Sequence, residues 1–285
     1  MSRVAYVNGR YLPHRAASVH VEDRGYQFAD GVYEVCEVRG GRLIDERRHM
    51  ERLARSLHEL RIRMPMKSSS LGVVLRETSR RNRVRDGLVY LQITRGVARR
   101  DHAFPAAVTP PSVVVTARSI DVAKGEQAAA NGVAVITVAD NRWDRVDIKS
   151  VSLLPNVLAK QAAREAGAAE AWFVDSNGYV TEGSSTNAYI VTRDGRIITR
   201  ATDHGILRGI TRTVLSDVAA AQGLKMEERR FTVEEAQAAR EAFITSATQV
   251  VMPVVSIDGR PVGNGAPGLV ATELRRDYHA HAEAG

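Results

Sequence analysis

The chain opens with short stretches in which apolar and polar residues alternate, separated by sequences typical of tight turns. Residues 6–12 form a hairpin signal, because the Asn8-Gly9 pair fits a two-residue turn with positive φ. Residues 33–44 repeat this pattern around a Gly-Gly pair, so we expect a second hairpin there. Further strands are expected at 88–94 and 112–117. The N-terminal third is thus predicted to consist of strands and hairpins with two helices.

The apolar residues change to helical spacing after Asp45. Met50, Leu53 and Leu57 recur at three- and four-residue intervals, which gives the segment one apolar face. The Asp45 side chain is expected to cap this helix. The same spacing predicts helices at 71–81, 153–166, 209–221 and 269–282.

Strands also alternate with helices in the second half of the chain. They are expected at 133–138, 171–174, 179–182, 188–192, 196–199, 242–245 and 250–257. Many are joined by hairpin turns such as Asp194-Gly195, so mixed sheets in an α+β arrangement fit better than a purely parallel sheet. The chain contains no GxGxxG or Walker pattern, which argues against the nucleotide-binding folds that depend on these motifs.

A change in composition separates the two halves of the chain. Residues 121–132 contain few bulky apolar side chains and are expected to link two domains. A chain of 285 residues is long enough for this arrangement. The prediction is therefore a small N-terminal α/β domain at 1–120, a linker at 121–132 and a larger C-terminal domain at 133–285, which would carry Lys149.

Composition narrows the classes of protein further. No run approaches the roughly 18 apolar residues of a membrane span, and residues 1–14 lack the apolar core of a signal peptide. The lone cysteine, Cys36, excludes an internal disulfide and a cysteine metal cluster. We therefore expect a cytoplasmic protein that has neither a membrane partner nor a metal site.

The net charge of +7 raises the question of a nucleic-acid partner. The densest basic run, residues 80–85, has no interleaved aromatic residues, and aromatics make up only 5% of the chain. Base stacking needs aromatic platforms, so this run is interpreted as a solvated helix end and no nucleic-acid partner is expected. The excess positive charge is available instead for anionic small molecules.

Lys149 stands out in this arginine-rich chain, where only five of the 40 basic residues are lysines. Apolar residues flank it on both sides, including Val146, Ile148 and Val151. A buried amine gives up its proton more easily and becomes a nucleophile toward carbonyl groups, which arginine cannot become. The alternative from the local pattern is a lysine that extends from the end of a strand into solvent.

Three features of the sequence suit a phosphate group. The stretch 205–212 places Gly209 before a helix, whose first N–H groups and positive dipole end attract an anion. The turn at 244–248 carries small and hydroxyl residues after an apolar strand. Arg52, in the first long helix, either is exposed to solvent or reaches a buried anion. Each pattern also occurs in proteins that bind no phosphate.

Two further segments carry candidate polar groups. Glu182 precedes a small polar loop at 183–187, which either lets a ligand approach the backbone or is a plain turn. Arg100 and His102 stand two residues apart, so in an extended segment both project to the same side. A guanidinium beside an imidazole suits a carboxylate, and a polar loop is the alternative. Taken together, these groups suit a ligand with an aldehyde, a ring nitrogen and a phosphate, and pyridoxal phosphate has all three.

These residues fall in an ordered set of motifs that resembles the fold-type IV pyridoxal-phosphate transaminases, and among them most closely the D-amino-acid transaminases. The motifs follow the family order through nearly the whole chain: YQFADGVYE at 26–34, HMERL at 49–53, ITRG at 93–96, DIKS at 147–150, VLAKQ at 157–161, TEGSSTN at 181–187, GILRGITR at 205–212 and ITSAT at 244–248. The resemblance implies a two-domain α+β fold with mixed sheets, helices packed on them and the active site between the domains.

The resemblance also implies roles for individual residues. Lys149 would form a Schiff base with the cofactor and move the substrate's proton, and Glu182 would keep the pyridine nitrogen protonated. Leu207 would pack against the face of the ring. The phosphate would be held by Arg52, Ile210, Thr211, Ser246 and Ala247. Some relatives carry Thr at the last of these positions, a difference that matters only if a hydroxyl binds the phosphate.

The Arg-x-His pair indicates the class of substrate. In D-amino-acid transaminases, the residues that match Arg100, His102 and Tyr33 bind the substrate's α-carboxylate, and the loop residues come from the neighbouring subunit. Thr248 is assigned to the substrate as well. The expected reaction of this homodimer is D-alanine with 2-oxoglutarate, giving pyruvate and D-glutamate. Branched-chain L-amino-acid transaminases share the cofactor residues and are the alternative, and aminodeoxychorismate lyases share them too.

Overall fold

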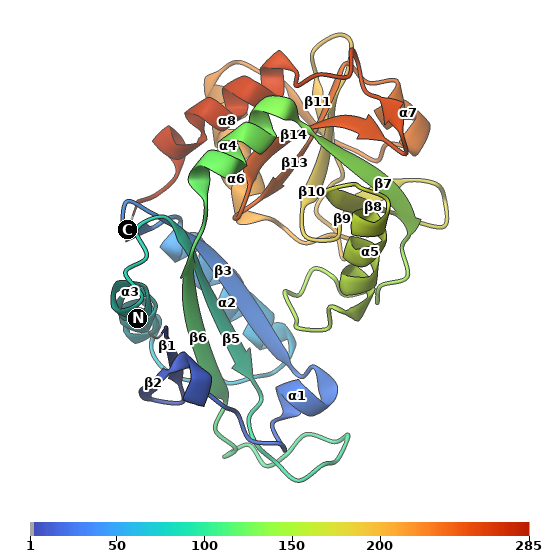
Figure 1. The fold of residues 1–285 in the computed structure, drawn as a ribbon. Helices are drawn as coiled ribbons and strands as arrows, with labels where there is room; N and C mark the ends of the chain where they lie inside the picture. Colours follow the sequence, from blue (N-terminus) through green and yellow to red (C-terminus); the bar gives the residue numbers. More distant parts are fainter. Residues whose placement is uncertain (1–2, 285) are drawn as a thin grey trace. The chain divides into compact units, whose positions relative to one another are not determined.

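The computed structural model describes residues 3–284, and these form two compact units (Figure 1). Unit 1 consists of residues 3–121, 148–152 and 283–284. Unit 2 consists of residues 122–147 and 153–282. The chain therefore passes from one unit to the other more than once, and neither unit is a continuous stretch of sequence.

The observed division differs from the expected one in two respects. The expected linker, 121–132, forms helix α4 (Val122–Asn131), which packs on strand β14 (Val250–Ile257) of unit 2. Alanine supplies the buried side of α4, so a search for bulky apolar residues misses this helix. The segment around Lys149, expected in the C-terminal domain, belongs to unit 1 because its backbone bonds to strand β3 (Gly31–Arg39).

Unit 1 is built on an antiparallel sheet in the order β2-β1-β6-β5-β3-β4. Besides β3, its strands are β1 (Val4–Val7), β2 (Arg10–Pro13), β4 (Arg42–Leu43), β5 (Gly87–Thr94) and β6 (Ser112–Ser119). Both expected hairpins, β1–β2 and β3–β4, are present. In the first turn, Asn8 and Gly9 have φ angles of 45° and 92°, the left-handed backbone that a two-residue hairpin turn requires.

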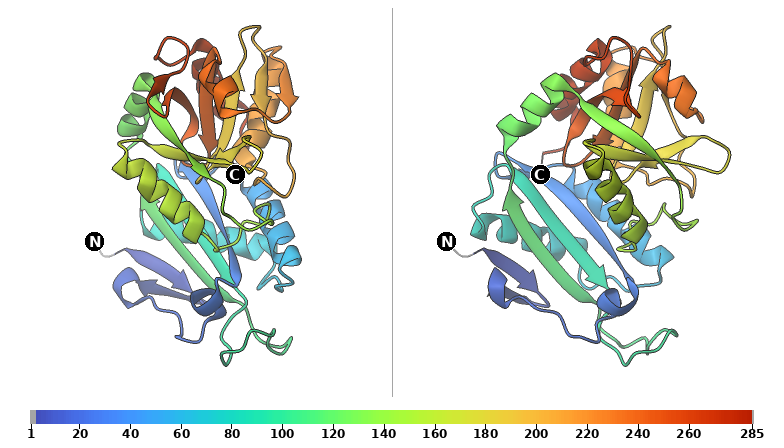
Figure 2. Two further views of the ribbon diagram at one scale, coloured as in Figure 1. Left: turned by 90° about the vertical axis from the view of Figure 1, so that its right-hand side faces the viewer. Right: turned by 45° about the vertical axis from the view of Figure 1, so that its right-hand side comes forward.

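Helices α2 and α3 cover one face of this sheet. The helices of unit 1 are η1 (His14–Ala16), α1 (Arg24–Phe28), α2 (Glu46–Glu59) and α3 (Ser68–Arg81). α2 packs on β3, while α3 packs on β1, β5 and β6 (Figure 2). Met50, Leu53 and Leu57 of α2 are buried in the core between helix and sheet, as their spacing predicted.

The expected side-chain cap of α2 is wrong. Asp45 occupies the N-cap position, but its backbone is left-handed (φ 55°), and within the described residues its carboxylate makes no capping hydrogen bond. The carboxylate instead accepts a hydrogen bond from the Glu283 amide at 3.1 Å. The Glu283 amide is thus the donor to Asp45 in place of an N–H group of α2. No local sequence pattern reveals a contact between residues so far apart.

Unit 2 contains a mixed sheet in the order β12-β11-β10-β13-β14-β7-β8-β9, with β15 paired to β14. Besides β14, its strands are β7 (Val133–Ala139), β8 (Glu170–Val174), β9 (Val180–Gly183), β10 (Asn187–Val191), β11 (Ile197–Thr199), β12 (Met226–Glu228), β13 (Glu241–Ser246) and β15 (Arg260–Pro261). The pairs β14–β7, β7–β8 and β11–β12 are parallel, and the other neighbours are antiparallel. A mixed sheet is therefore present in unit 2, whereas the sheet of unit 1 is antiparallel.

Helices cover both faces of the middle of this sheet. Besides α4, they are α5 (Leu154–Glu165), α6 (Ile210–Ala221), α7 (Val233–Gln237) and α8 (Leu269–His281). Strand β10 is buried along its whole length. Tyr189 and Val191 join a core with α6 and α8, while Ala188 and Ile190 join the core on the opposite face. Burial on both faces explains why this strand is a continuous apolar run.

Within residues 3–284, no helix is long and apolar enough to cross a membrane. The same residues include no cluster of His, Cys, Asp and Glu side chains suited to a metal ion. Cys36 is a free thiol in the core of unit 1. Burial raises the pKa of this thiol well above its ordinary value, so we expect it to be unreactive.

Candidate functional site

Lys149 lies in unit 1, beside strand β3. Its carbonyl oxygen accepts a hydrogen bond from the Tyr33 amide at 3.0 Å, and its own amide donates to the Ser56 hydroxyl at 3.3 Å. The Nζ atom lies over the Tyr33 ring, 4.2 Å from its centre. The structure thus brings together Lys149 and Tyr33, which the sequence indicated as the reactive amine and a substrate contact.

Tyr90, on β5, extends this site although no sequence motif singled it out. Its ring lies 5.7 Å from the Tyr33 ring, and its hydroxyl donates to Gln92 Oε1 at 2.6 Å. Burial raises the pKa of Tyr90 to about 12, so its hydroxyl stays protonated at neutral pH. The alternation of β5 was the available signal, since Tyr90 and Gln92 share one face of the strand and Tyr33 is the cross-strand partner of Gln92.

Arg52, on α2, binds a carboxylate of the protein itself. Its Nε and Nη2 atoms donate to the two carboxylate oxygens of Glu34 at 2.8 and 2.7 Å, and His49 Nδ1 lies 2.7 Å from the same carboxylate. Burial acts to raise the pKa of Glu34, but the charge of Arg52 and the hydrogen bonds from Arg52 and His49 hold it well below its ordinary value. The Arg52 side chain is only 10% exposed, so the solvent-exposed alternative is excluded. The ionised Glu34 fixes the plane of its guanidinium.

Glu182 is buried in unit 2, on strand β9, with donors on both carboxylate oxygens. Arg142 Nη1 donates to one oxygen at 2.5 Å, while the Leu207 amide and the Asn187 side chain donate to the other at 3.0 and 3.1 Å. Burial raises the pKa of Glu182, and the charge of Arg142 opposes that rise. Leu207, expected to pack on a cofactor ring, therefore contacts Glu182 directly through its backbone.

Arg142 is a site residue that the sequence argument missed. Its Nε and Nη2 atoms donate to Asp140 at 2.9 and 2.8 Å, and its side chain is buried. The Thr181 hydroxyl donates to the same Asp140 carboxylate at 2.8 Å. Arg142 therefore bridges two carboxylates: Asp140 orients it through Nε and Nη2, and its Nη1 is directed at Glu182. The signal in the sequence was the two-residue spacing of Asp140 and Arg142, which places both on one side of an extended segment.

The small polar loop after β9 is held by the buried carboxylate of Glu170. The loop hydroxyls all donate to this carboxylate, from Ser184, Ser185 and Thr186. Lys160 Nζ lies 3.4 Å from it as well. These contacts explain the loop hydroxyls and Lys160, the lysine of the motif at 157–161, by a structural role that needs no ligand.

The helix start proposed for a phosphate is the N-terminus of α6. Ile210 and Thr211 begin the helix after the N-cap Gly209, and no side chain among the described residues caps it. A Cβ atom at Gly209 would lie 2.3 Å from the side-chain oxygen of Asn187, so this close approach requires glycine. An uncapped helix start presents its N–H groups and positive dipole end to an anion.

The second proposed phosphate segment is the turn between β13 and β14, which carries Ser246, Ala247 and Thr248. Ser246 Oγ lies 3.0 Å from Thr248 Oγ1 and accepts a hydrogen bond from the Gln249 amide at 3.2 Å. Val250, which follows, has a φ of 59°, a left-handed conformation that is rare for a β-branched residue. Helix α6 packs on β13, so unit 2 holds both phosphate-suited segments on contacting elements.

Arg100 and His102 lie in unit 1 and share one aromatic neighbour. The Arg100 guanidinium carbon lies 5.1 Å from the centre of the Phe28 ring, and the centre of the His102 ring lies 5.5 Å from it. Both side chains therefore lie on the same side of their loop, in agreement with their two-residue spacing. The carboxylate of Asp101, between them, accepts a hydrogen bond from the Ala103 amide at 3.1 Å.

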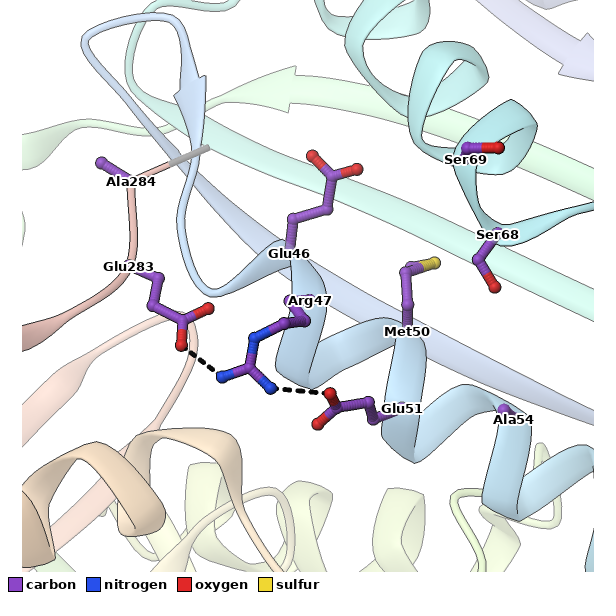
Figure 3. Close-up of a pocket in the computed structure, with 9 residues that line it drawn as sticks. All are labelled: Glu46, Arg47, Met50, Glu51, Ala54, Ser68, Ser69, Glu283 and Ala284. Carbon is purple, nitrogen blue, oxygen red and sulfur yellow. Dashed lines mark hydrogen bonds and ion pairs between the residues drawn. The ribbon is translucent and has the colours of Figure 1, made fainter.

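A pocket of about 570 Å³ in unit 1 is lined by none of the proposed site residues among those the structure describes (Figure 3). It lies between α2, the start of α3 and the C-terminal segment. Its charged side chains are all paired: Arg47 donates to Glu51 at 2.6 Å and to Glu283 at 2.5 Å, and Glu46 pairs with Arg76, which is not part of the lining. Because these charges are already paired, the pocket offers no guanidinium for the cofactor's phosphate or the substrate's carboxylate.

The sequence matches the family model described as amino-transferase class IV over residues 31–257. The matched region includes Lys149 and Glu182 and extends through parts of both units. The chain therefore belongs to the class IV aminotransferases, which are enzymes that transfer amino groups. Their cofactor is pyridoxal phosphate, and the prediction of a fold-type IV enzyme is confirmed.

Proteins similar to this chain include D-alanine aminotransferases. The one from Bacillus licheniformis is 44% identical over 268 residues, which cover 94% of this chain and 93% of that protein. The one from Staphylococcus haemolyticus is 38% identical over 280 residues, which cover 98% of each. The sequence relatives support transamination of D-amino acids.

Solved structures of branched-chain amino acid aminotransferases are similar to this chain as well. A structure of the T.th. enzyme with pyridoxamine 5'-phosphate has a TM-score of 0.89 and 29% identity, and the match covers 98% of this chain and 93% of that chain. The two units described here therefore have the fold of a known aminotransferase along almost their whole length.

The groups present in each unit fit pyridoxal phosphate. Unit 1 contains an amine, Lys149, and a guanidinium, Arg52, held rigidly by a buried carboxylate. Unit 2 contains the buried Glu182, an uncapped helix start and a hydroxyl-bearing turn. An amine matches the cofactor's aldehyde, a carboxylate its ring nitrogen, and the remaining donors its phosphate.

Proposed function

We propose that this enzyme transfers the amino group of D-amino acids to 2-oxo acids, with D-alanine and 2-oxoglutarate giving pyruvate and D-glutamate. The observation that carries the proposal is the placement of Arg100 and His102 against one ring, in a chain whose relatives include D-alanine aminotransferases. A guanidinium and an imidazole held against the same ring suit a carboxylate, which all these substrates share. Tyr33, beside Lys149, and Thr248 are assigned to the substrate with them.

Lys149 is proposed to carry the central proton transfer. When bound, pyridoxal phosphate supplies an aldehyde that condenses with amines and a ring that accepts the electrons released at the substrate's Cα. The Lys149 amine would hold the cofactor between turnovers and take the proton from the substrate's Cα during them. The face of the Tyr33 ring, 4.2 Å from Nζ, favours a cation there and so stabilises the amine once it has taken the proton.

Glu182 is proposed to keep the ring nitrogen protonated. Its pKa is raised by burial, so a protonated nitrogen beside it would stabilise the carboxylate in the ionised form. Arg142, oriented by Asp140, holds one carboxylate oxygen, and the Leu207 amide holds the other. These contacts restrict the rotation of Glu182 and keep it directed at one position.

The phosphate is proposed to bind Arg52, the amides of Ile210 and Thr211, and the turn at Ser246 and Ala247. The support is the character of each group: a buried guanidinium of fixed orientation, an uncapped helix start and a turn with a hydroxyl. Ala247 can contribute only its backbone N–H. The phosphate affinity of this chain would therefore rest on amides and the guanidinium more than on hydroxyls.

We also propose that the enzyme is a homodimer. Leu154, Val157 and Leu158 form an apolar stripe along α5 and are 69%, 58% and 59% exposed. Adjacent exposed apolar side chains are typical of a contact surface, and a second copy of the chain is the partner we propose for it. Light scattering tests this proposal: the wild type is expected at the mass of a dimer and Leu158→Glu at the mass of a monomer. A monomeric wild type would contradict it.

A branched-chain L-amino-acid aminotransferase is the second candidate, and the similarity to the solved branched-chain structure favours it. Assays of D-alanine and of L-leucine, each with 2-oxoglutarate, separate the two. We expect kcat/KM to be at least about 100-fold higher for D-alanine, because the two enantiomers place their reacting hydrogens differently at a fixed base. A preference for L-leucine would contradict the proposal. Arg100→Ala is expected to raise KM for D-alanine, and an unchanged KM would exclude its role as a carboxylate contact.

A further inference from the structure

The loop that carries Arg100 and His102 is anchored by a network centred on Asp30, immediately before β3. Asp30 Oδ2 accepts hydrogen bonds from Arg24 Nε at 2.8 Å and from Arg95 Nε at 2.7 Å, and Oδ1 accepts from Arg95 Nη2 at 2.9 Å. Both arginine side chains are buried. One carboxylate therefore holds two buried guanidinium groups in place.

Arg24 connects this network to the backbone of the loop. Its Nη1 donates to the carbonyl oxygen of Asp101 at 2.6 Å, and its Nη2 lies 3.4 Å from the carbonyl oxygen of His102. Asp101 stands between Arg100 and His102, so these contacts fix the backbone from which both side chains extend. A hydrogen bond from a charged group is stronger than a neutral one, and its loss would leave a buried donor unpaired.

Aromatic contacts add to the anchoring of the loop. The ring of Phe28, on α1, contacts the side chains of both Arg100 and His102. The Arg95 guanidinium carbon lies 3.7 Å from the centre of the Phe104 ring, further along the loop. Cation–π contacts are strongest where the cation is withdrawn from water, as the buried Arg95 is. The network thus contacts the loop at Asp101 and again at Phe104.

Arg24 and Arg95 differ in the other groups to which they donate hydrogen bonds. Arg95 donates to the carbonyl oxygens of Leu60 and Arg61 at 2.7 and 3.0 Å, just after α2, so it also links parts of the scaffold. The side-chain hydrogen bonds that the structure gives for Arg24 go to Asp30 and to the loop. Replacement of Arg24 therefore tests the loop contact with the least disturbance of the fold.

We propose that Asp30 and Arg24 are positioning residues for substrate recognition: they fix the backbone at Asp101 and thereby the directions of Arg100 and His102. The inference rests on the proposed function, because the substrate's carboxylate is the ligand assigned to that pair. Neither Asp30 nor Arg24 touches the substrate. Their loss leaves the lysine and the cofactor groups in place, so substrate binding weakens while the chemical step continues.

The kinetic test compares Arg24→Met with Arg10→Met, a control at an exposed arginine of β2, both as cofactor-loaded enzymes. For Arg24→Met we expect KM to rise about tenfold for both D-alanine and 2-oxoglutarate, with kcat within about threefold of the wild type. The dissociation constant of the cofactor should not change. Arg24→Lys should be intermediate, because one ammonium cannot reproduce the planar fork of donors. Arg10→Met should match the wild type.

Hydrogen exchange of the backbone amides at 98–104 gives a readout that does not depend on turnover. Exchange there should be faster in Arg24→Met and in Asp30→Asn than in the wild type and in Arg10→Met. Unchanged exchange would overturn the proposal, as would faster exchange with both KM values unchanged. A joint loss of kcat and cofactor affinity in Arg24→Lys, the milder variant, would also overturn it by showing a general structural role. A wild type that does not turn over D-alanine contradicts the proposed function instead.

Discussion

Two buried glutamates, one in each unit, show how the surrounding charges set the behaviour of the same side chain. Glu34 is 1% exposed and Glu182 is 6% exposed. Glu34 faces the bidentate guanidinium of Arg52 and a histidine, which together hold its pKa well below the ordinary value despite burial. Glu182 faces Arg142, but Asp140 shares that guanidinium, and burial leaves the pKa of Glu182 raised.

The difference separates a structural carboxylate from a responsive one. A carboxylate that stays ionised acts as a fixed countercharge, which is what the orientation of Arg52 needs. A carboxylate whose pKa is raised responds strongly to a nearby cation, which is what a partner for a ring nitrogen needs. The extent of burial does not distinguish the two cases, and the balance of charge among the partners does.

The largest expected effect comes from removing the amine of Lys149, because the proposed roles of both glutamates depend on a bound cofactor. Lys149→Ala should bind no cofactor as a Schiff base, so the purified protein should lack the visible absorbance and should not turn over D-alanine. Lys225→Ala, at an exposed lysine, is the matched control and should keep both properties. A Lys149→Ala enzyme that retained absorbance and turnover would remove the basis for the comparison of the two glutamates.

Glu182→Gln should have the next largest effect. The amide keeps the size of the side chain but carries no charge to stabilise a protonated ring nitrogen, so kcat should fall by about 100-fold or more. Cofactor binding should be largely retained, and absorbance titration checks this. Glu126→Gln, at an exposed glutamate of α4, is the control. If kcat is unaffected in Glu182→Gln, the ring nitrogen needs no ionised partner and the responsive role is wrong.

Glu34→Gln should act mainly on stability. Loss of the carboxylate leaves the buried Arg52 charge without its countercharge, so the free energy of unfolding should fall by about 3 kcal/mol. Urea unfolding of the cofactor-free protein measures this change. Glu51→Gln, which removes one partner of an exposed ion pair, should have a much smaller effect. Equal effects of the two substitutions would show that Glu34 is not a structural countercharge.

The smallest expected effect is on the pH dependence of the free energy of unfolding. It is also the most direct test of the difference between Glu34 and Glu182. The folded pKa of Glu34 is lowered, so its contribution is present above the ordinary glutamate value of about 4.3 and is lost as pH falls through the folded value. The folded pKa of Glu182 is raised, so its contribution is present below about 4.3 and is lost as pH rises through the folded value.

The measurement is the free energy of unfolding of the cofactor-free wild type and of both Gln variants, at about pH 3.5 and about pH 7. The wild-type advantage over Glu34→Gln should grow as the pH rises. The wild-type advantage over Glu182→Gln should shrink over the same range. Changes of the same sign in both variants would contradict the opposite shifts of the two pKa values.

Local patterns in the sequence predicted local structure well. The Asn8-Gly9 turn, the apolar face of α2 and the mixed sheet of unit 2 all follow from turn chemistry and from apolar spacing over a few residues. The two failures have different causes. Helix α4 buries alanine, which a search for bulky residues overlooks, and the Asp45 carboxylate bonds to the amide of Glu283, a residue far away in the chain.

The sequence named candidate site residues, but it could not name the side chains that bond to them. Arg142 and Glu182 are 40 residues apart, and Glu34 and Arg52 are 18 apart, so no local pattern could pair them. The family motifs contain several of these residues, yet a motif does not state which side chain bonds to which. The phosphate contacts, the homodimer and the cytoplasmic location stay predictions, and the last can be tested by cell fractionation.

The placement of Lys149 in unit 1 also bears on how the newly made chain acquires structure. The ribosome completes residues 3–121 well before it makes the segment 148–152 that bonds to β3. Nascent chains generally fold from the N-terminus onward, so most of this unit can form early. The amine of Lys149, which we propose binds the cofactor, is made only after the first strand of unit 2, β7. A fragment that ends at residue 121 would lack the segment at Lys149, so under the proposed role of this lysine a Schiff base with the cofactor can form only after translation has passed residue 149.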